Sequence, residues 1–333
     1  LEWINNYSNS FGNHNVKAMF GYSYQEALYS GFNAENKDFP NDALEDNNLG
    51  TGKFMKKKDE LGMGSYKNGY KLIAFFGRVS YDWKGRYMLT ASLRHEGSTK
   101  FGEHYKWGNF PAVSAGWRIS DEAFMAGTKS WLTDLKLRAD FGVTGNQDFG
   151  SYKSLDTMQG FGYYMYNGKS YQVWGPGKNP NDDLHWEKGK NWNVGLDWAL
   201  FNGNLFGSFN YFNRTQQDLL GDYNVTVPPY LFTTTFVNVG TMRNTGFEFD
   251  VTWNAIKKKD FTYTLNVVGA TMGNEFVKFS NSKFVGQDFY YMVDTQDPYP
   301  FHTLQRIEKG RRIGSFYMWK YAGITSDGKW IVY

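Results

Sequence analysis

Apolar and polar side chains alternate along much of this chain, most clearly between Lys71 and Thr144. Successive side chains of a β-strand point to opposite faces, so apolar residues at every second position predict strands with one apolar and one polar face. The first such strand carries Ile73, Phe75, Val79 and Tyr81 on its apolar side and Arg78, Ser80 and Asp82 on its polar side.

A glycine after this strand predicts a turn. We expect Trp83–Gly85 to form a three-residue hairpin loop in which Gly85 takes the left-handed conformation. This loop would place Tyr81 opposite Tyr87, and Val79 opposite Leu89. All the apolar positions would then share one face of the hairpin. The same register sets Gly77 against Ala91 and Phe75 against Leu93.

Two later hairpins repeat this arrangement. Asn202-Gly203 is the dipeptide best suited to a type I′ turn, and it predicts that Leu200 lies opposite Leu205. A short basic turn, Lys257–Lys259, joins another pair of apolar runs. An apolar band and a polar face recurring in hairpin after hairpin predict the wall of an antiparallel transmembrane β-barrel. The further pairs expected are Leu196 with Phe209, Val194 with Tyr211, and Phe247, Phe249, Val251 and Trp253 with Phe261, Tyr263, Leu265 and Val267.

The composition is consistent with such a wall. Aromatic residues make up 19% of the chain, and many Tyr and Trp residues stand at strand ends, where their rings suit a membrane interface. A mean hydropathy of −0.59 fits strands that are apolar only at alternate positions. The longest apolar run, near Leu72–Phe76, is far shorter than the roughly 20 residues of a membrane helix. A net charge of +3 gives no support to nucleic-acid binding, and the lack of cysteine excludes disulfides and thiolate metal sites.

Polar stretches divide the chain into about ten expected wall strands. We expect long loops at Ser30–Asn68, Gly97–Lys106 and Gly145–His185, on the extracellular side, where barrels of this type have their long loops, with short periplasmic turns between. The chain begins at Leu1 without an initiator Met or signal peptide and stops at Tyr333. We therefore interpret residues 1–333 as one part of a larger barrel domain.

Several sequence blocks resemble the SusC/RagA family of TonB-linked outer-membrane proteins, in the order in which that family has them. The resemblance implies a barrel of about 22 strands, with an N-terminal plug and the last strands missing from this chain. It also implies import of oligosaccharides or peptides, with TonB and a SusD-like surface lipoprotein as partners. The blocks are FPNDAL (Phe39–Leu44), Phe76–Glu122, LKLRADFGVTGNQ (Leu135–Gln147), NVGTMRNTGFEFDVTW (Asn238–Trp253) and IGSFYMWKYAGI (Ile313–Ile324).

Aromatic residues in the Gly145–His185 loop are the candidate ligand-binding residues. We expect Tyr163, Tyr166, Tyr171 and Trp174 to stack on sugar rings or to pack against the lipoprotein. Packing against neighbouring loops is the other interpretation of these residues.

Charged residues at polar positions of the strands are expected to face the lumen of the barrel. These residues are Arg78, Arg94, Glu96, Arg138 and Asp140. They either line the path of the solute or simply face water, as alternate positions of any barrel do.

Catalytic, metal and cofactor sites have no support in the sequence. The five histidines show no ligand spacing. Asp182 and Asp183 would need a cleft around them to act as a glycosidase pair. Two other functional classes stay open, a passive porin and a soluble carbohydrate-binding β-sandwich. The porin shares the wall pattern, whereas the sandwich would bury its apolar face between two sheets.

Overall fold

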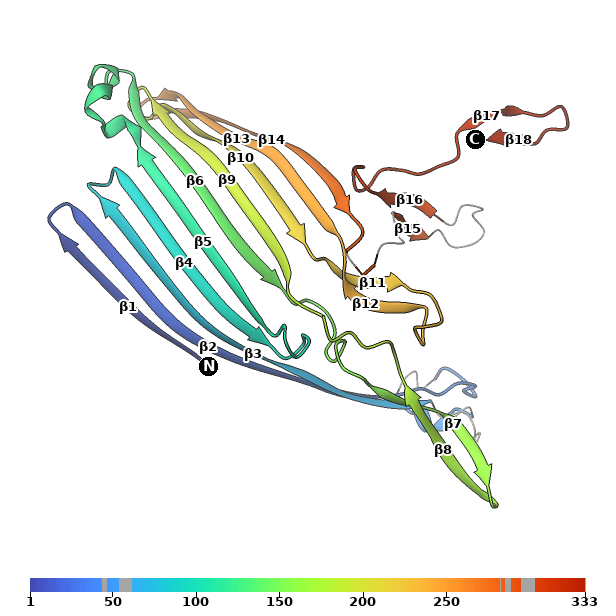
Figure 1. Cartoon of the computed structure of the whole chain (residues 1–333). Helices are drawn as coiled ribbons and strands as arrows, with labels where there is room; N and C mark the ends of the chain where they lie inside the picture. The colour runs from blue at the N-terminus through green and yellow to red at the C-terminus, as the bar shows by residue number, and fades with distance from the viewer. Residues whose placement is uncertain (44–46, 54–61, 282, 285–288, 295–302, 333) are drawn as a thin grey trace.

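The computed structural model describes residues 1–43, 47–53, 62–281, 283–284, 289–294 and 303–332 (Figure 1). Leu44, the last residue of the FPNDAL block, lies outside these residues. Ten strands form one antiparallel sheet in the order β1-β2-β3-β4-β5-β6-β9-β10-β13-β14, which confirms the predicted fold class and the expected number of wall strands. The ten are β1 (Glu2–Phe11), β2 (His14–Ala34), β3 (Met63–Trp83), β4 (Tyr87–Ser98), β5 (Trp107–Arg118), β6 (Leu132–Asn146), β9 (Glu187–Leu200), β10 (Leu205–Gln217), β13 (Thr241–Lys257) and β14 (Thr262–Lys278).

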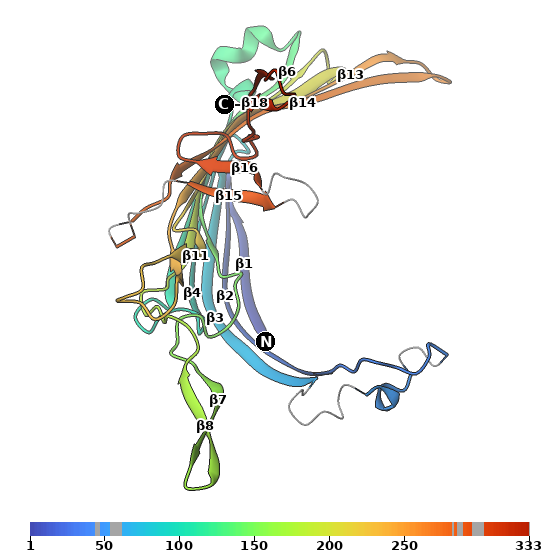
Figure 2. The ribbon, with the colours of Figure 1, turned by 90° about the vertical axis from the view of Figure 1, so that its right-hand side faces the viewer.

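The sheet is curved and stays open, with β1 and β14 at its two edges (Figure 2). The pairing register aligns apolar residues across the strands, and these residues remain exposed: Val79 is 52% accessible and Phe209 is 49% accessible. The β-sandwich interpretation is therefore wrong, because a sandwich would cover this face with a second sheet. One apolar row runs Tyr81, Leu89, Ala115, Ala139, Val194, Tyr211 and Phe247, and the polar row beside it runs Ser80, Thr90, Ser114, Asp140 and Asn193.

The register of the first predicted hairpin is wrong by two residues. Trp83 pairs with Tyr87, so the loop is Lys84–Arg86 and Tyr81 lies opposite Leu89. Lys84 takes a left-handed conformation as well as Gly85, with φ of 57° and 65°, and this moves the turn one residue along. Side chains alternate with period two, so a shift of two residues leaves the apolar and polar faces as predicted.

The Asn202-Gly203 hairpin has the predicted register. Leu200 pairs with Leu205, and the pairs expected further along the strands are also present. Asn202 and Gly203 have φ of 56° and 78°, and the Asn204 amide donates to the Phe201 carbonyl at 3.2 Å, as a type I′ turn requires. The next hairpin pairs Val251 with Val267 and Trp253 with Leu265, with a bulge after Asn254.

One end of the sheet, the turn end, has aromatic rings next to the tight turns. Trp83 stacks on Tyr87 with 5.5 Å between ring centroids, and Tyr87 stacks on Trp117 at 6.4 Å. The Glu122 carboxylate accepts hydrogen bonds from the Tyr87 hydroxyl, from Trp117 Nε1 at 3.0 Å and from Arg86 Nη1 at 3.1 Å. These bonds tie the ring stack to the link between β5 and β6, which contains the short 3₁₀ helices η3 (Ile119–Asp121) and η4 (Ala123–Thr128).

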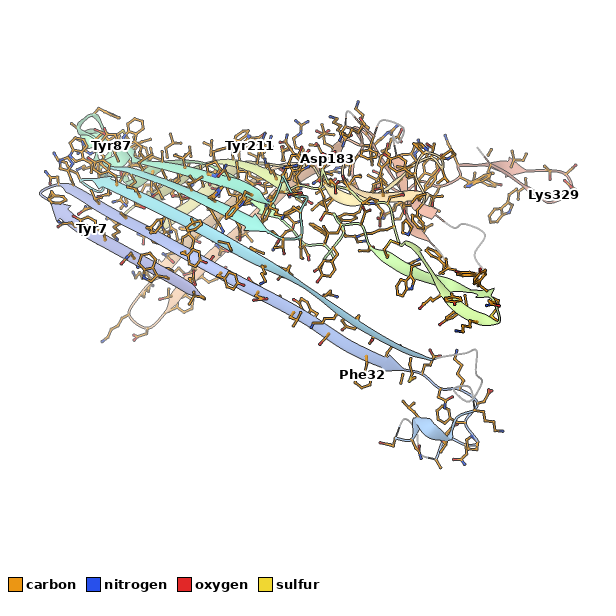
Figure 3. All side chains as sticks on the ribbon, turned by 60° about the horizontal axis from the view of Figure 1, so that its bottom comes forward. Tyr7, Phe32, Tyr87, Asp183, Tyr211 and Lys329 are labelled. Atoms are coloured by element: carbon orange, nitrogen blue, oxygen red, sulfur yellow. The ribbon has the colours of Figure 1, made fainter. Side chains whose placement is uncertain are left out.

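The opposite end, the loop end, has the long connections. β2 and β3 run on to Ala34 and back from Met63, so the predicted Ser30–Asn68 loop begins later and ends earlier than expected. Phe32 lies on this extension, beyond the rest of the sheet (Figure 3). In the described residues, no helix has the length and apolar content needed to cross a membrane. The other elements are η1 (Leu49–Thr51) and the hairpins β7 (Met158–Tyr166) with β8 (Lys169–Pro176), β11 (Leu220–Asn224) with β12 (Thr234–Asn238), β15 (Phe289–Asp294) with β16 (Thr303–Glu308), and β17 (Tyr321–Ile324) with β18 (Trp330–Val332).

A seam opens in the sheet at the loop end. β5 pairs with β6 only from Ala112 to Arg118, although β5 begins at Trp107. A buried cluster lies beside the unpaired part, and the Trp186 indole anchors it by donating to the Lys106 carbonyl at 2.9 Å. This cluster, here called the seam cluster, consists of Phe101, Phe110, Leu184 and Trp186.

The face assignment predicts unequal costs at neighbouring positions. Ala91 lies on the apolar face, about four residues from the turn, so Ala91→Arg should cost about 2–4 kcal/mol if this face contacts the middle of a bilayer. Ser92→Arg, one residue along on the polar face, should cost far less. Unfolding of the full-length protein from vesicles by urea measures both values. Equal costs would contradict the assignment.

The seam cluster predicts a second stability difference. Trp186 is 3% exposed, so Trp186→Ala should lower the free energy of unfolding by about 3–5 kcal/mol. Trp174, which is 60% exposed on β8, is the matched control, and Trp174→Ala should change the stability by less than about 1 kcal/mol. The same urea titration compares the two variants. If Trp186→Ala leaves the free energy of unfolding unchanged, the seam cluster does not stabilise this part of the sheet.

Candidate functional site

The five charged residues predicted to face the lumen lie on the polar face of the sheet, in three places. Arg94 Nε and Nη2 each donate to the Glu96 carboxylate at 2.8 Å, and Glu96 is buried. This paired geometry fixes both side chains near the loop end of β4. The two charges neutralise each other, so this pair offers little net charge to a solute.

Arg138 forms a second paired site on three neighbouring strands. Its guanidinium donates to Asp197 at 2.7 and 2.8 Å and to Asn210 Oδ1 at 2.9 Å. Gly195 lies beneath it, and a Cβ atom at that position would lie 2.9 Å from Arg138 Nη2. The absent side chain at Gly195 therefore gives the guanidinium room to cross β9 and to bridge β6, β9 and β10.

Arg78 and Asp140 line one hollow on the polar face. Its volume is about 650 Å³, and its lining includes the small residues Ala112 and Gly142, which pair across β5 and β6. Arg78 Nη2 makes a long contact with the sulfur of Met19, at 4.0 Å. Other charged and amide groups of the hollow are Arg214, Glu248, Asn191 and Asn193. Mixed charges around an open hollow can exchange hydrogen bonds with a polar solute.

The aromatic residues predicted to bind ligand lie on the β7–β8 hairpin, which projects away from the sheet (Figure 1). The pairing places Tyr166 and Tyr171 on one face, where Tyr171 also stacks on Tyr164 at 5.6 Å. Tyr163 and Trp174 lie on the other face, because Tyr163 pairs with Gln172 and Trp174 follows Gln172 by two residues. The hairpin thus presents two aromatic faces, and the four residues do not form a single platform.

The sequence did not predict a cavity that lies at the loop end. It has a volume of about 560 Å³ and is lined by side chains from five separate segments of the chain. Asp183 marks its place, at the opposite end of the wall from Tyr87 (Figure 3). Its lining includes Tyr105, Trp107, Asp183, His185, Lys188, Asp218, Asn238 and Lys283.

A buried amide builds one wall of this cavity. Asn238 is 4% exposed, and its side chain donates to the carbonyls of His185 at 2.7 Å and Asp218 at 3.0 Å. Its Oδ1 accepts a hydrogen bond from the His185 amide at 2.9 Å. Asn238 therefore holds the chain before β9 against the chain after β10. No spacing in the sequence reveals such a contact between distant residues.

Ion pairs set the charge inside the cavity. His185 Nε2 lies 3.8 Å from Asp218 Oδ2, and the Asp218 carboxylate raises the pKa of His185 above its ordinary value, although burial opposes the shift. In turn His185 lowers the pKa of Asp218, and Lys188 and Lys190 lower it further. Asp183 forms an ion pair with Lys283 and raises the pKa of that ammonium group. Each carboxylate of the cavity thus has a basic side chain beside it, His185 for Asp218 and Lys283 for Asp183.

The side chains around the loop-end cavity are suited to binding a ligand. Among the residues that the structure describes, no three His, Asp or Glu side chains converge to hold a metal ion. Asp183, considered above as one of a glycosidase pair, is instead bonded to Lys283. The aromatic rings, amides and ion pairs of the cavity can supply stacking and hydrogen bonds to a ligand.

Comparison with known proteins identifies the family of this chain. Residues 2–324 match the model of the family described as TonB dependent receptor-like, beta-barrel. TonB-dependent receptor P39 of Formosa agariphila is 31% identical over 322 residues, which is 96% of this chain and 28% of that protein. TonB-dependent receptor SusC of Bacteroides thetaiotaomicron is 31% identical over 263 residues, covering 77% of this chain and 26% of SusC.

Solved structures show the same relationship. The RagAB peptide transporter matches all of this chain with a TM-score of 0.80 and 26% identity, and the match covers 35% of the longer chain. The RagAB peptide importer in its 'open-open' state gives a TM-score of 0.81. The chain therefore spans about a third or less of the relatives that it matches. A family match over nearly the whole chain, together with the ten-stranded two-faced sheet, means that this chain belongs to the TonB-dependent receptor β-barrels of the outer membrane, with SusC and RagAB transporters among its relatives.

Proposed function

We propose that the protein to which this wall belongs imports a nutrient, an oligosaccharide or a peptide, across the outer membrane. The observation that carries the proposal is the sheet itself, whose ten strands are apolar on one face and polar on the other and match the RagAB transporter along the whole chain. The polar face would line the lumen, with Arg78, Asp140, Arg138, Arg94 and Glu96 along the path of the solute.

TonB and a SusD-like surface lipoprotein are the partners in this proposal. The support is the likeness to SusC and to the RagAB transporter, whose solved structures include 'open-open' and 'closed-closed' states. A wide barrel lets solutes leak unless it is plugged, and moving a plug needs work supplied from outside the outer membrane. TonB is the expected source of that work, and a plug and a TonB-contacting segment would belong to the whole protein.

Dependence on TonB separates this function from the passive porin. Cells that express the full-length protein should lose uptake of its cargo when TonB is deleted, because a porin needs no energy and would continue to conduct. The measurement is accumulation of labelled glycans and peptides of graded size. Uptake that continues at the same rate without TonB would favour the porin, and preference for one class of cargo would identify the substrate.

The β7–β8 hairpin is the proposed contact for the ligand or the lipoprotein. Its face with Tyr164, Tyr166 and Tyr171 groups three rings, so Tyr166→Ala with Tyr171→Ala should weaken ligand binding or lipoprotein retention by about tenfold, equivalent to about 1.4 kcal/mol. Tyr163→Ala with Trp174→Ala, on the other face, should have a smaller effect. Both double variants are compared by ligand titration and by co-purification of the lipoprotein.

The outcome decides between the two interpretations of the aromatic residues. Loss of ligand binding alone assigns the three-ring face to the ligand, and loss of the lipoprotein alone assigns it to the lid. If all four alanine substitutions together change neither quantity, the rings only pack against neighbouring loops.

A further inference from the structure

Two lysines stand on the apolar face of the wall at its loop end. Alternation along β9 puts Asn191 and Asn193 on the polar face and Lys188, Lys190 and Trp192 on the apolar face, in line with Val194 and Leu196. Lys190 is exposed and lies directly beyond Trp192. A cation in this position faces the lipid side of the barrel and is separate from the lumen.

The height of Lys190 fits the edge of the bilayer. Lys190 lies ten residues before Leu200, the last residue of β9 at the turn end. Ten residues of strand extend about 33 Å, and a tilt of about 40° reduces this to about 25 Å, which is the height of the apolar band of a membrane barrel. Lys190 therefore lies where the acyl chains end and the lipid head groups begin, on the side with the long loops.

The neighbouring strands reach the same boundary. Lys190 pairs with Thr215, and Thr215 pairs with Arg243, so these three residues form a row on the apolar face. Arg243 is neutralised by Glu275, to which its Nε donates at 2.8 Å. Among the described residues, neither Lys188 nor Lys190 has a carboxylate within 4.0 Å. The two lysines thus bring positive charge to the head-group level of the wall.

The loop-end cavity adjoins these lysines. Lys188 lines it together with Trp107, whose ring stacks on His95 at 4.5 Å on one side and remains 49% exposed. Of the carboxylates of the cavity, Asp183 pairs with Lys283, and Asp218 lies 3.8 Å from His185. The site therefore combines an exposed aromatic ring and hydrogen-bonding groups, suited to a sugar, with ammonium groups suited to a phosphate.

We propose that Lys188, Lys190 and the cavity bind the phosphorylated sugar head group of an outer-leaflet glycolipid. The phosphate lies between the two ammonium groups, and the sugar lies against Trp107. The acyl chains run down the apolar face beside Trp192 and Val194. Lipid binding here is a property of the outside of the wall and does not require transport. A transported saccharide is the other candidate for the cavity, and it would need no acyl chains and no phosphate.

The test uses the full-length protein, purified in a neutral detergent and titrated with lipid A, a phosphorylated disaccharide that carries acyl chains. Native mass spectrometry counts the bound lipid. Lys188→Gln with Lys190→Gln should weaken binding by roughly tenfold or more, because each lysine near an anionic head group contributes attraction. Lys17→Gln is the matched control, since Lys17 pairs with Ser80 on the polar face, and it should bind as the unchanged protein does.

Three further arms make the result decisive. Lys188→Arg with Lys190→Arg keeps the charge and should retain binding, which guards against a loss caused by misfolding. Dephosphorylated lipid A should bind weakly, and neither inorganic phosphate nor a free oligosaccharide at equal concentration should displace lipid A. Equal binding of the dephosphorylated lipid, an equal loss in the Lys17 variant, or displacement by inorganic phosphate or by a free oligosaccharide would each overturn the proposal.

Discussion

Backbone hydrogen bonding within the membrane is the constraint on which this structure depends. Amide and carbonyl groups in hydrocarbon have no water to bond with, so every strand must pair along its length with two neighbours. In the ten-stranded ladder from β1 to β14, the main places where a strand has only one neighbour are the two edge strands, the seam between β5 and β6, and the extension of β2 and β3 at the loop end. At the seam, Phe101, Phe110, Leu184 and Trp186 fill the space beside the unpaired part of β5, and the Trp186 indole donates a hydrogen bond to the Lys106 carbonyl.

The sequence predicts the two faces of the wall well, because side chains along a strand alternate with a period of two residues. The face of every residue follows from its parity, so an error in the first hairpin, where Lys84 joins Gly85 in the left-handed region, changed the partners and left the faces correct. Asn202-Gly203 gave the right register because both residues tolerate positive φ. Parity also accounts for the divided aromatic quartet, since Tyr163 and Tyr166 differ by an odd number and must point to opposite sides of β7.

The alternation of side chains does not predict the loop-end cavity. Its lining comes from five segments far apart in the chain, and Asn238 joins two of them through bonds to His185 and Asp218. Nothing local to Asn238 distinguishes it from the many other asparagines in the loops. The extension of β2 and β3 past the rest of the sheet was missed for a related reason, because residues exposed on both faces carry no alternation. Alternation of apolar and polar residues predicts a strand only where the two faces of that strand meet different environments.

The places where the β7–β8 and β11–β12 hairpins leave the sheet have a consequence for how such proteins diversify. β6 pairs with β9, and β10 pairs with β13, as direct neighbours, so each excursion starts and ends at adjacent points of the ladder. A hairpin attached in this way can lengthen or shorten at its tip without changing which wall strands pair. The projecting hairpins and the wall can then evolve at different rates.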